Sequence, residues 1–311
     1  MTEVAILAED LRKTYGDVVA VDHISLAVPR GTVLGLLGVN GAGKTTMVRM
    51  LTTVLRPDSG RGVVNGFDVQ QQPQAVRRSI GLAGQSAAVD ENLTGRENLV
   101  LVGRLQHMTK AAAQQRSSEL LDQFRLTDAA DRPVRTYSGG MRRRLDLGAA
   151  LVTHPPVLFL DEPTTGLDPA SRLDLWIVIE TLVADGTTVL LTTQYLEEAD
   201  RLADNIVVID GGLIVAEGSA KQLKAQLGDT VIEFEFHSPS DATRAAELLD
   251  GTVAAGTIVR LVMSNGPVTL QDAMNKLSAG DLTPGHVALR EPTLDDVFLT
   301  LTRTATDGEL V

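Results

Sequence analysis

A glycine-rich segment with one lysine at residues 38–46 is the part of this sequence best suited to chemistry. An apolar run at 32–37 precedes it and an apolar stretch at 47–51 follows, which predicts a strand, a loop and a helix in that order. Glycines let backbone N–H groups curve around an anion, and the helix N-terminus adds its positive dipole end. The spacing is therefore typical of a phosphate-binding P-loop, rather than of an accidental glycine-rich turn. The predicted nucleotide contacts are Gly38, Asn40, Gly41, Ala42, Gly43, Lys44, Thr45 and Thr46.

In such a loop Lys44 lies on the β- and γ-phosphates, and the Thr45 hydroxyl binds Mg²⁺. A second apolar run at 157–160 ends in Asp161 and Glu162. A buried strand would deliver Asp161 to its C-terminal tip to hold Mg²⁺, and Glu162 could act as general base toward the attacking water. A strand ending in two carboxylates is also a common solvent-facing terminus. The P-loop is what favours the functional interpretation.

A third element is a Ser-Gly-Gly turn, Ser138-Gly139-Gly140, which precedes a predicted helix. In isolation this would be an ordinary serine helix cap, but a helix N-terminus also binds anions. It lies about twenty residues before the Asp-Glu strand, and Asp168 follows that strand closely. The chain therefore carries a second anion site besides the P-loop.

Composition limits the function. The 311 residues include 43% hydrophobic and 3% aromatic residues, which favours a globular α/β protein. The absence of cysteine excludes disulfides, thiol catalysis and cysteine-bound zinc. A net charge of −12 argues against nucleic acid as the main partner, although Arg142, Arg143 and Arg144 could form a local basic patch. Without an apolar run of about 20 residues or a signal segment, the chain is expected to be cytosolic.

The pattern along the chain predicts two domains with a boundary near residue 228. Strand-like alternation covers 4–30, a turn-rich piece at 56–62 precedes a short strand at 63–64, and helical spacing covers about 93–152. Apolar strands are predicted at 157–160, 188–191 and 206–209. In the last 80 or so residues, strands at 231–236, 258–263 and 287–289 alternate with helices at 242–249 and 270–277. This predicts a small C-terminal α/β domain.

With the P-loop, the Ser-Gly-Gly turn and the Asp-Glu strand in this order, residues 4–225 resemble an ATP-binding-cassette (ABC) ATPase. The resemblance implies a P-loop NTPase (RecA-like) core with an antiparallel β subdomain and a helical subdomain at about 90–150. Residues 1–228 would form the nucleotide-binding domain, and 229–311 a C-terminal regulatory or dimerisation domain. It further implies ATP hydrolysis with Mg²⁺, a second copy of the chain in an ATP-sandwich dimer, and an integral-membrane permease.

The resemblance assigns further residues. Gln85 matches a glutamine that senses Mg²⁺ and couples to the membrane partner, and Tyr15 matches an aromatic that stacks on adenine. Alternatively, these are a surface glutamine and an edge-strand tyrosine. Ser138, Gly139 and Gly140 match the signature that closes on the opposite subunit's nucleotide. Asp168 matches a residue that communicates across the dimer.

Three positions depart from the family pattern. Val39 stands where proline is common, and Met141 replaces a glutamine of the signature. Gln194 stands where most relatives have the switch histidine. An amide can still bond the γ-phosphate, but it does not become cationic near neutral pH. We therefore expect Gln194 to be catalytic together with Glu162.

Segments at 137–144, 192–200 and 290–299 together resemble the daunorubicin-resistance subfamily. This implies the ATPase subunit of a drug or antibiotic exporter, on the cytoplasmic face of the cell membrane through its permease. Thr293 and Asp296 in the last segment also make a simple helix cap. The alternatives are a nucleic-acid-associated ABC ATPase, an exporter of lipid, and a P-loop kinase, which would leave Gln85 and the Ser-Gly-Gly turn without a role.

Overall fold

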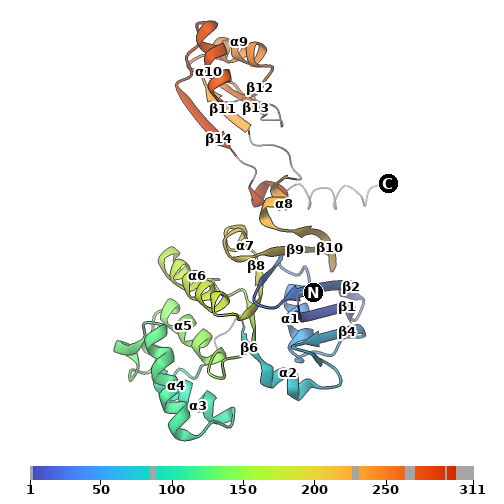
Figure 1. Ribbon diagram of the computed structural model, residues 1–311, viewed down its shortest axis with the longest axis vertical. Helices are drawn as coiled ribbons and strands as arrows, with labels where there is room; N and C mark the ends of the chain where they lie inside the picture. The colour runs from blue at the N-terminus through green and yellow to red at the C-terminus, as the bar shows by residue number, and fades with distance from the viewer. Residues whose placement is uncertain (1–2, 85–88, 226–230, 263–269, 291–292, 299–311) are drawn as a thin grey trace. The chain divides into compact units, whose positions relative to one another are not determined.

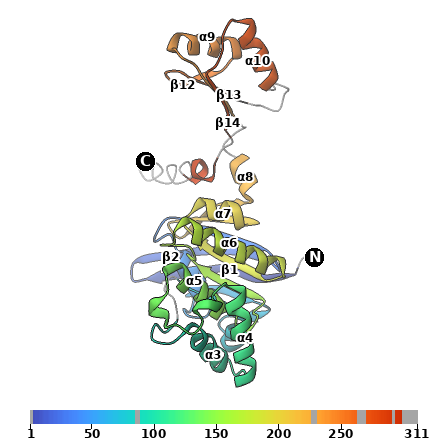
Figure 2. The same cartoon turned by 90° about the vertical axis from the view of Figure 1, so that its left-hand side faces the viewer.

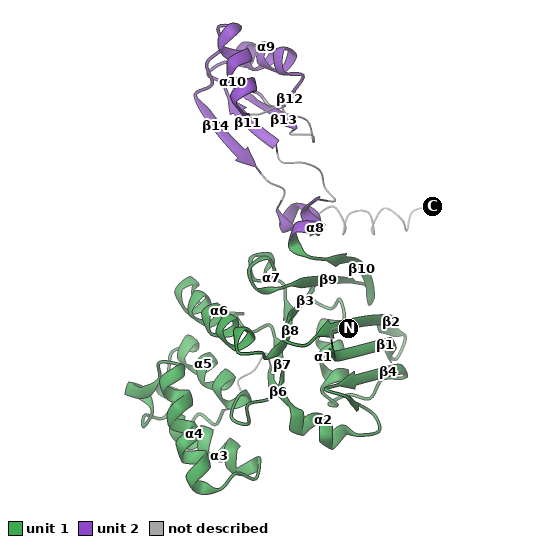
Figure 3. Cartoon of the chain, viewed as in Figure 1, with its two compact units in different colours: residues 1–220 green, residues 221–311 purple. Residues whose placement is uncertain are grey.

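The structure is a computed structural model that describes residues 3–84, 89–225, 231–262, 270–290 and 293–298. The chain divides into two compact units, Met1–Ala220 and Lys221–Val311 (Figure 3). The break lies eight residues before the predicted boundary near 228, and residues 226–230 fall outside the described ranges. Each unit has its own apolar core.

The first unit contains two sheets (Figure 1). One is antiparallel, with strands in the order β2-β1-β4-β5. Its strands are β1 (Val4–Tyr15), β2 (Val18–Pro29), β4 (Ser59–Val64) and β5 (Phe67–Asp68). The alternation expected for residues 4–30 is confirmed in the second half of β2, where buried Ile24, Leu26 and Val28 alternate with exposed residues, whereas β1, which pairs with β2 through several register shifts, does not alternate regularly.

The second sheet has six strands in the order β10-β9-β3-β8-β7-β6, and all neighbours are parallel except β10 and β9. Every residue of β3, β7 and β8 is buried, as expected for parallel strands covered on both faces. The strands are β3 (Val33–Leu37), β6 (Ile80–Ala83), β7 (Val157–Asp161), β8 (Thr188–Thr193), β9 (Asn205–Asp210) and β10 (Leu213–Gly218). The three strands predicted at 157–160, 188–191 and 206–209 are confirmed.

Helices surround this sheet (Figures 1 and 2). A helical segment is formed by α3, α4 and α5 between β6 and β7, within the range predicted as helical. Two short 3₁₀ turns, η1 (Thr127–Ala129) and η2 (Val134–Thr136), interrupt it before α5. The α-helices of the region up to residue 225 are α1 (Lys44–Leu51), α2 (Pro73–Ser79), α3 (Gly95–Leu105), α4 (Lys110–Gln123), α5 (Gly139–Ala150), α6 (Pro169–Ala184), α7 (Leu196–Leu202) and α8 (Ala220–Ala225).

The second unit has the order β11 (Val231–Glu235), α9 (Pro239–Leu249), β12 (Thr252–Ala255), β13 (Ile258–Val262), α10 (Leu270–Ala279) and β14 (His286–Arg290). Its antiparallel sheet, β12-β13-β11-β14, gives the βαββαβ arrangement of ferredoxin-like folds. The C-terminal α/β prediction is therefore right in type, although β12 was not predicted. The predicted strand end at Met263 lies outside the described residues.

One local prediction is wrong. The turn-rich piece at 56–62 was expected to end before a strand at 63–64, but β4 begins at Ser59. Residues Ser59 and Arg61 pair with β1 at Arg12 and Glu9. A side chain at Gly60 would collide with the carbonyl oxygen of Asp10, so glycine permits a close strand pairing there.

Candidate nucleotide site

The P-loop runs from the end of β3 into α1 and lines a cavity of about 350 Å³. Gly43 has a φ of +113°, and a side chain there would collide with the carbonyl oxygen of Ala20 on β2. Gly38 is equally close to the carbonyl oxygen of Ile209. Neighbouring strands therefore dictate glycine at both positions. The cavity is lined by Asn40, Gly41, Ala42, Gly43, Lys44, Thr45, Thr46 and Glu162.

Lys44 is the cation of this cavity and is only 4% exposed. Its ammonium donates to the carbonyl oxygens of Gly38 (2.7 Å) and Val39 (3.0 Å) and lies 3.9 Å from Glu162 Oε1. Burial lowers the pKa of Lys44, while the negative charges of Glu162 and Asp161 oppose that shift. A further anion against the ammonium would favour its charged form in the same way.

Asp161, at the end of β7, is buried and accepts hydrogen bonds from two threonine hydroxyls. Thr45 Oγ1 donates to Asp161 Oδ1 over 3.2 Å, and Thr192 Oγ1 on β8 donates to the same oxygen over 2.5 Å. The P-loop and the carboxylate strand are therefore joined directly. Thr192 was not predicted as a site residue, because it is one of three threonines in β8 and nothing in the sequence distinguishes it.

Glu162 turns the chain out of β7 with a φ of +49°, a left-handed conformation that non-glycine residues rarely adopt. Its N–H donates to the carbonyl oxygen of Thr192 (3.1 Å) and to the hydroxyl of Thr192 (3.0 Å), which fixes this backbone. Backbone outliers of this kind concentrate at functional sites. The conformation places the Glu162 carboxylate in the wall of the P-loop cavity.

The order of the parallel sheet brings the predicted residues to one edge. The P-loop follows β3, Gln194 follows the neighbouring β8, and Asp161 ends β7. Ligands in open α/β sheets bind outside these carboxyl ends. Gln194 is exposed there, directly after the last residue of β8. Gln85 comes two residues after the end of β6 in the sequence and lies outside the described residues.

The Ser-Gly-Gly turn forms the start of α5, away from the residues that line the P-loop cavity. Ser138 caps the helix by accepting from the N–H of Met141 (3.2 Å). A side chain at Gly140 would collide with Ser171 on α6, whereas one at Gly139 would meet open space. Gly140 is thus explained by packing within this chain, but Gly139 is not.

Asp168 caps α6 and is exposed. Its carboxylate accepts from the N–H (3.0 Å) and the hydroxyl (2.6 Å) of Ser171, and these bonds lower the pKa of Asp168. Tyr15, at the end of β1, is 46% exposed and pairs with Val18 on β2. The same strand supplies Ala20, which lies against the P-loop, so Tyr15 belongs to the hairpin beside that loop.

The three consecutive arginines do not form a basic surface patch. Arg143 is buried, donates to the carbonyl oxygens of Pro163 (2.6 Å) and Gly84, and lies 3.3 Å from Asp146. Arg142 pairs with Glu91 at 2.8 Å. Burial lowers the pKa of Arg143, and the charges of Asp146, Glu198 and Asp161 oppose this. Arg143 instead ties α5 to the loops after β6 and β7, a role that sequence analysis missed.

The residues at the cavity fit a Mg²⁺ ion that is bound mainly through phosphate. Within the described ranges, no group of three or more histidine or carboxylate side chains could hold a metal. Mg²⁺ in phosphate-transfer sites usually takes only one or two protein ligands and completes its shell with phosphate and water. The Thr45 hydroxyl and the Asp161 carboxylate, 3.2 Å apart, meet that requirement.

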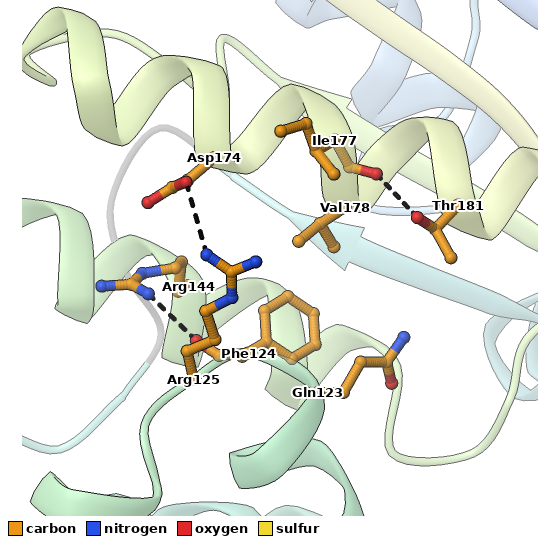
Figure 4. A pocket seen from close by; sticks show the side chains of 8 residues that line it. All are labelled: Gln123, Phe124, Arg125, Arg144, Asp174, Ile177, Val178 and Thr181. Carbon is orange, nitrogen blue, oxygen red and sulfur yellow. Dashed lines mark hydrogen bonds and ion pairs between the residues drawn. The ribbon is translucent and has the colours of Figure 1, made fainter.

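A smaller cavity of about 210 Å³ lies between α4, α5 and α6 (Figure 4). Phe124, Ile177 and Val178 give it an apolar wall, and Arg125 reaches Asp174 at 3.9 Å across it. This cavity shares no residue with the P-loop or with Asp161 and Glu162. We therefore assign the nucleotide chemistry to the P-loop cavity.

Comparison with known proteins identifies the family to which the chain belongs. A family model described as ABC transporter matches residues 21–165. The chain is 52% identical over 308 residues to a daunorubicin resistance ATP-binding protein, DrrA3, of Streptomyces coeruleorubidus, with 97% of each chain covered. It is 46% identical over 317 residues to a doxorubicin resistance ATP-binding protein, DrrA, of Mycobacterium tuberculosis (98% and 96% covered). A solved ATP-binding subunit of an ABC transporter is 28% identical, with a TM-score of 0.65 over 72% of this chain and 93% of that one.

Proposed function

We propose that this chain, which belongs to the ABC transporter family of ATP-binding proteins, powers the export of drugs through a separate membrane protein. As a member of that family it is an ATPase, converting ATP and water to ADP and phosphate. One observation carries the proposal: Lys44 and Glu162 line one cavity, and Asp161 is hydrogen-bonded to Thr45 of the same loop, in a chain half identical to a drug-resistance protein.

In the proposed mechanism each side chain has one role. Lys44 binds the β- and γ-phosphates and neutralises charge that develops on them. Glu162 accepts a proton from the water that attacks the γ-phosphate, as a general base. Gln194 donates a hydrogen bond from its side-chain amide N–H to the γ-phosphate or to the attacking water. Mg²⁺, held by Thr45 and Asp161, would supply charge neutralisation, with Gln85 as a further proposed contact. Tyr15 would stack on the adenine ring.

We further propose that two copies of the chain enclose the nucleotide, with Ser138, Gly139 and Asp168 acting across the dimer. The start of α5 is a helix N-terminus, which can bind an anion, and its residues do not line the chain's own P-loop cavity. Open space at Gly139 leaves room for a ligand to approach its backbone. A phosphate of the nucleotide bound to the other copy could then contact the N-terminus of α5 and the backbone at Gly139.

Ser138→Arg is expected to leave ATP binding by the isolated chain within about 2-fold of wild type and to block turnover, because the added side chain fills the place of the other copy's phosphate. ATP binding is measured by equilibrium titration and turnover by phosphate release. Ser240→Arg, at an exposed serine in the first turn of α9, is the matched control and should retain both. Wild-type turnover by Ser138→Arg would rule out the shared site.

The proposed contact with the permease is an apolar groove between the end of α1, β6, α3 and α5. Within the described residues, no helix is long and apolar enough to cross a membrane. The groove is lined by Val54, Leu82 and Val102, and Val54 and Leu82 are 67% and 40% exposed. Exposed apolar side chains around a groove are typical of a protein–protein contact. An amphipathic helix of the permease would cover them and hold the chain at the cytoplasmic face of the membrane.

Val54→Asp is expected to weaken binding to the permease by about 10-fold or more, because a charge buried in an apolar contact is costly. ATP hydrolysis by the chain alone should stay within about 2-fold of wild type, since Val54 does not line the P-loop cavity. Binding is measured by co-purification from membranes. Leu213→Asp changes a residue of similar exposure (50%) at the start of β10 and should not affect binding. Equal loss in both variants would contradict the assigned groove.

We propose a regulatory or dimer-stabilising role for the second unit. Its core, built around Ile232, Phe234 and Leu277, is independent of the first unit's cores. The alternation predicted for β11 places Ile232 and Phe234 inside, while Glu233 pairs with Arg260 at 2.7 Å on the other face. None of the residues that line the P-loop cavity comes from this unit.

The function is tested by transport in inverted membrane vesicles that contain the chain and its native permease. ATP-dependent accumulation of an anthracycline such as daunorubicin is expected with wild type and not with Glu162→Gln. Accumulation that is equal with and without ATP would overturn the proposal. A cargo of lipid would instead give ATP-dependent lipid movement with no drug accumulation.

A further inference from the structure

Helix α6 packs beside α7, the helix that follows Gln194 (Figure 2). The residues on α6 are four apart, and those on the facing segment are three apart, so each set lies on one face of its helix. We call this contact the α6–α7 seam. It consists of Arg172, Trp176 and Glu180 on α6, and of Tyr195, Glu198 and Arg201 on the facing segment.

The seam has three contacts in succession. The Arg172 guanidinium lies 4.6 Å from the centre of the Tyr195 ring. At the middle, Trp176 Nε1 donates to Glu198 Oε1 over 2.9 Å. At the far end, Arg201 lies 5.2 Å from the centre of the Trp176 ring and bonds Glu180 at 2.8 and 3.2 Å. The contacts run continuously from solvent-exposed Glu180 to the residue next to Gln194.

The middle contact is the unusual one, because it buries a carboxyl group. Glu198 is 0% exposed and Trp176 is 2% exposed. Burial raises the pKa of Glu198, and nearby polar groups, among them Thr193, Trp176 and Arg172, oppose the rise. A buried carboxyl group is costly to keep, and such groups are retained in some proteins because they fix one arrangement.

One end of the seam, the contact between Arg172 and Tyr195, lies next to residues proposed for the nucleotide site. Gln194 directly precedes Tyr195, the first residue of the seam. Asp168 caps the start of α6, one turn before Arg172. The same first turn carries Ser171, against which Gly140 of the Ser-Gly-Gly turn packs without room for a side chain. Helix α6 therefore connects the elements that would meet the second copy to the segment that carries Gln194.

We propose that the α6–α7 seam positions Gln194 for hydrolysis, with Trp176 and Glu198 as positioning residues that do not touch ATP. This inference rests on the proposed role of Gln194 and extends it. Turnover depends on the placement of Gln194 to within a fraction of an ångström, whereas ATP affinity depends mainly on the P-loop. Loosening the seam should therefore slow turnover without weakening ATP binding.

The first test removes the middle contact in the full chain. Trp176→Phe keeps a buried ring but loses the N–H donor, and it is expected to lower kcat by about 5- to 10-fold with KM for ATP changed less than about 2-fold. Glu198→Gln keeps an oxygen that accepts this N–H and should retain most of the activity. Glu119→Ala, which breaks an exposed ion pair with Arg116 outside the seam, is the matched control and should behave like wild type.

A double-mutant cycle shows whether the seam acts through Gln194. In the Gln194→Ala background, Trp176→Phe should lower kcat by less than about 2-fold further, because there is no amide left to position. If the losses of kcat from Trp176→Phe and Gln194→Ala multiply fully in the double variant, the inference is overturned, but the proposed ATPase function is not. Unchanged kcat in Gln194→Ala would remove Gln194 from the site and the inference with it. Equal phosphate release from wild type and Glu162→Gln would instead contradict the proposed function itself.

A second measurement stands even where Trp176→Phe fails to fold. Trp176 is the only tryptophan of the sequence, so the intrinsic fluorescence of the wild-type chain reports the seam. Saturation with Mg²⁺ and ATP is expected to shift its emission, and Gln194→Ala should reduce that shift by at least about half. Emission that does not respond to ATP, or responds equally in Gln194→Ala, would show that the seam is not linked to the site.

Discussion

Replacing Glu162 with glutamine is expected to lower ATP turnover by about 100-fold or more while ATP binding is retained. Glutamine has nearly the same shape as glutamate but cannot accept a proton from water near neutral pH. The backbone bonds from Glu162 to Thr192 are independent of the side chain and should hold the left-handed turn in the variant. Phosphate release at saturating ATP and Mg²⁺ measures the loss.

The same variant should accumulate as a dimer when ATP is present, because the ATP enclosed between the two copies can no longer be hydrolysed. Gel filtration with and without ATP detects this change in mass. Glu247→Gln alters an exposed glutamate on α9 in the second unit and should match wild type in both measurements. Normal hydrolysis by Glu162→Gln would show that this residue is not the general base.

Lys44→Ala is expected to weaken ATP binding by about 100-fold or more. The lysine is buried, and removing it leaves phosphate charge unpaired, an effect of about 3–5 kcal/mol for a broken buried ion pair. Hydrolysis should disappear as a consequence. Affinity is measured by titration with a fluorescent ATP analogue.

Lys44 also lies 3.9 Å from Glu162 and offsets its charge, so its removal can alter stability as well. Thermal unfolding of the variant therefore accompanies the titration. Lys110→Ala changes an exposed lysine at the first turn of α4 and should bind ATP normally. ATP affinity within 2-fold of wild type in a folded Lys44→Ala chain would exclude the P-loop as the phosphate site.

Local sequence patterns predicted the features that depend on interactions between residues close together in the sequence, such as helix caps and buried strands. Thr94 and Glu97 form a capping box at the start of α3, the arrangement that a threonine and a glutamate three residues apart predict. The Thr94 N–H donates to the Glu97 carboxylate, and the Glu97 N–H donates to the Thr94 hydroxyl. Thr293 and Asp296 likewise exchange the bonds of a helix cap, so this part of the tail segment is explained by helix initiation. Short continuous apolar runs such as 157–160 predicted buried parallel strands, because such strands are covered on both faces.

Features that depend on distant residues were not predictable in this way. Thr192 and Arg143 act at the site only because the sheet order places β8 beside β7 and α5 against the loops after β6 and β7. The arginine run suggested a charged surface, yet burial of Arg143 is decided by backbone carbonyl groups that come from elsewhere in the chain. Glu198 gave no signal either, since its partner Trp176 is 22 residues away.

The central claim is that ATP is hydrolysed at the cavity lined by Lys44 and Glu162 and that hydrolysis is coupled to a membrane partner. One rate measurement tests this claim most directly. Phosphate release is followed for the chain co-purified with its native permease, at saturating ATP and Mg²⁺, with and without daunorubicin. We expect the drug to raise the rate of the wild-type complex and to leave the Glu162→Gln complex near background. Phosphate release that is the same in both complexes, or a phosphorylated small molecule in place of free phosphate, would contradict the ATPase assigned here.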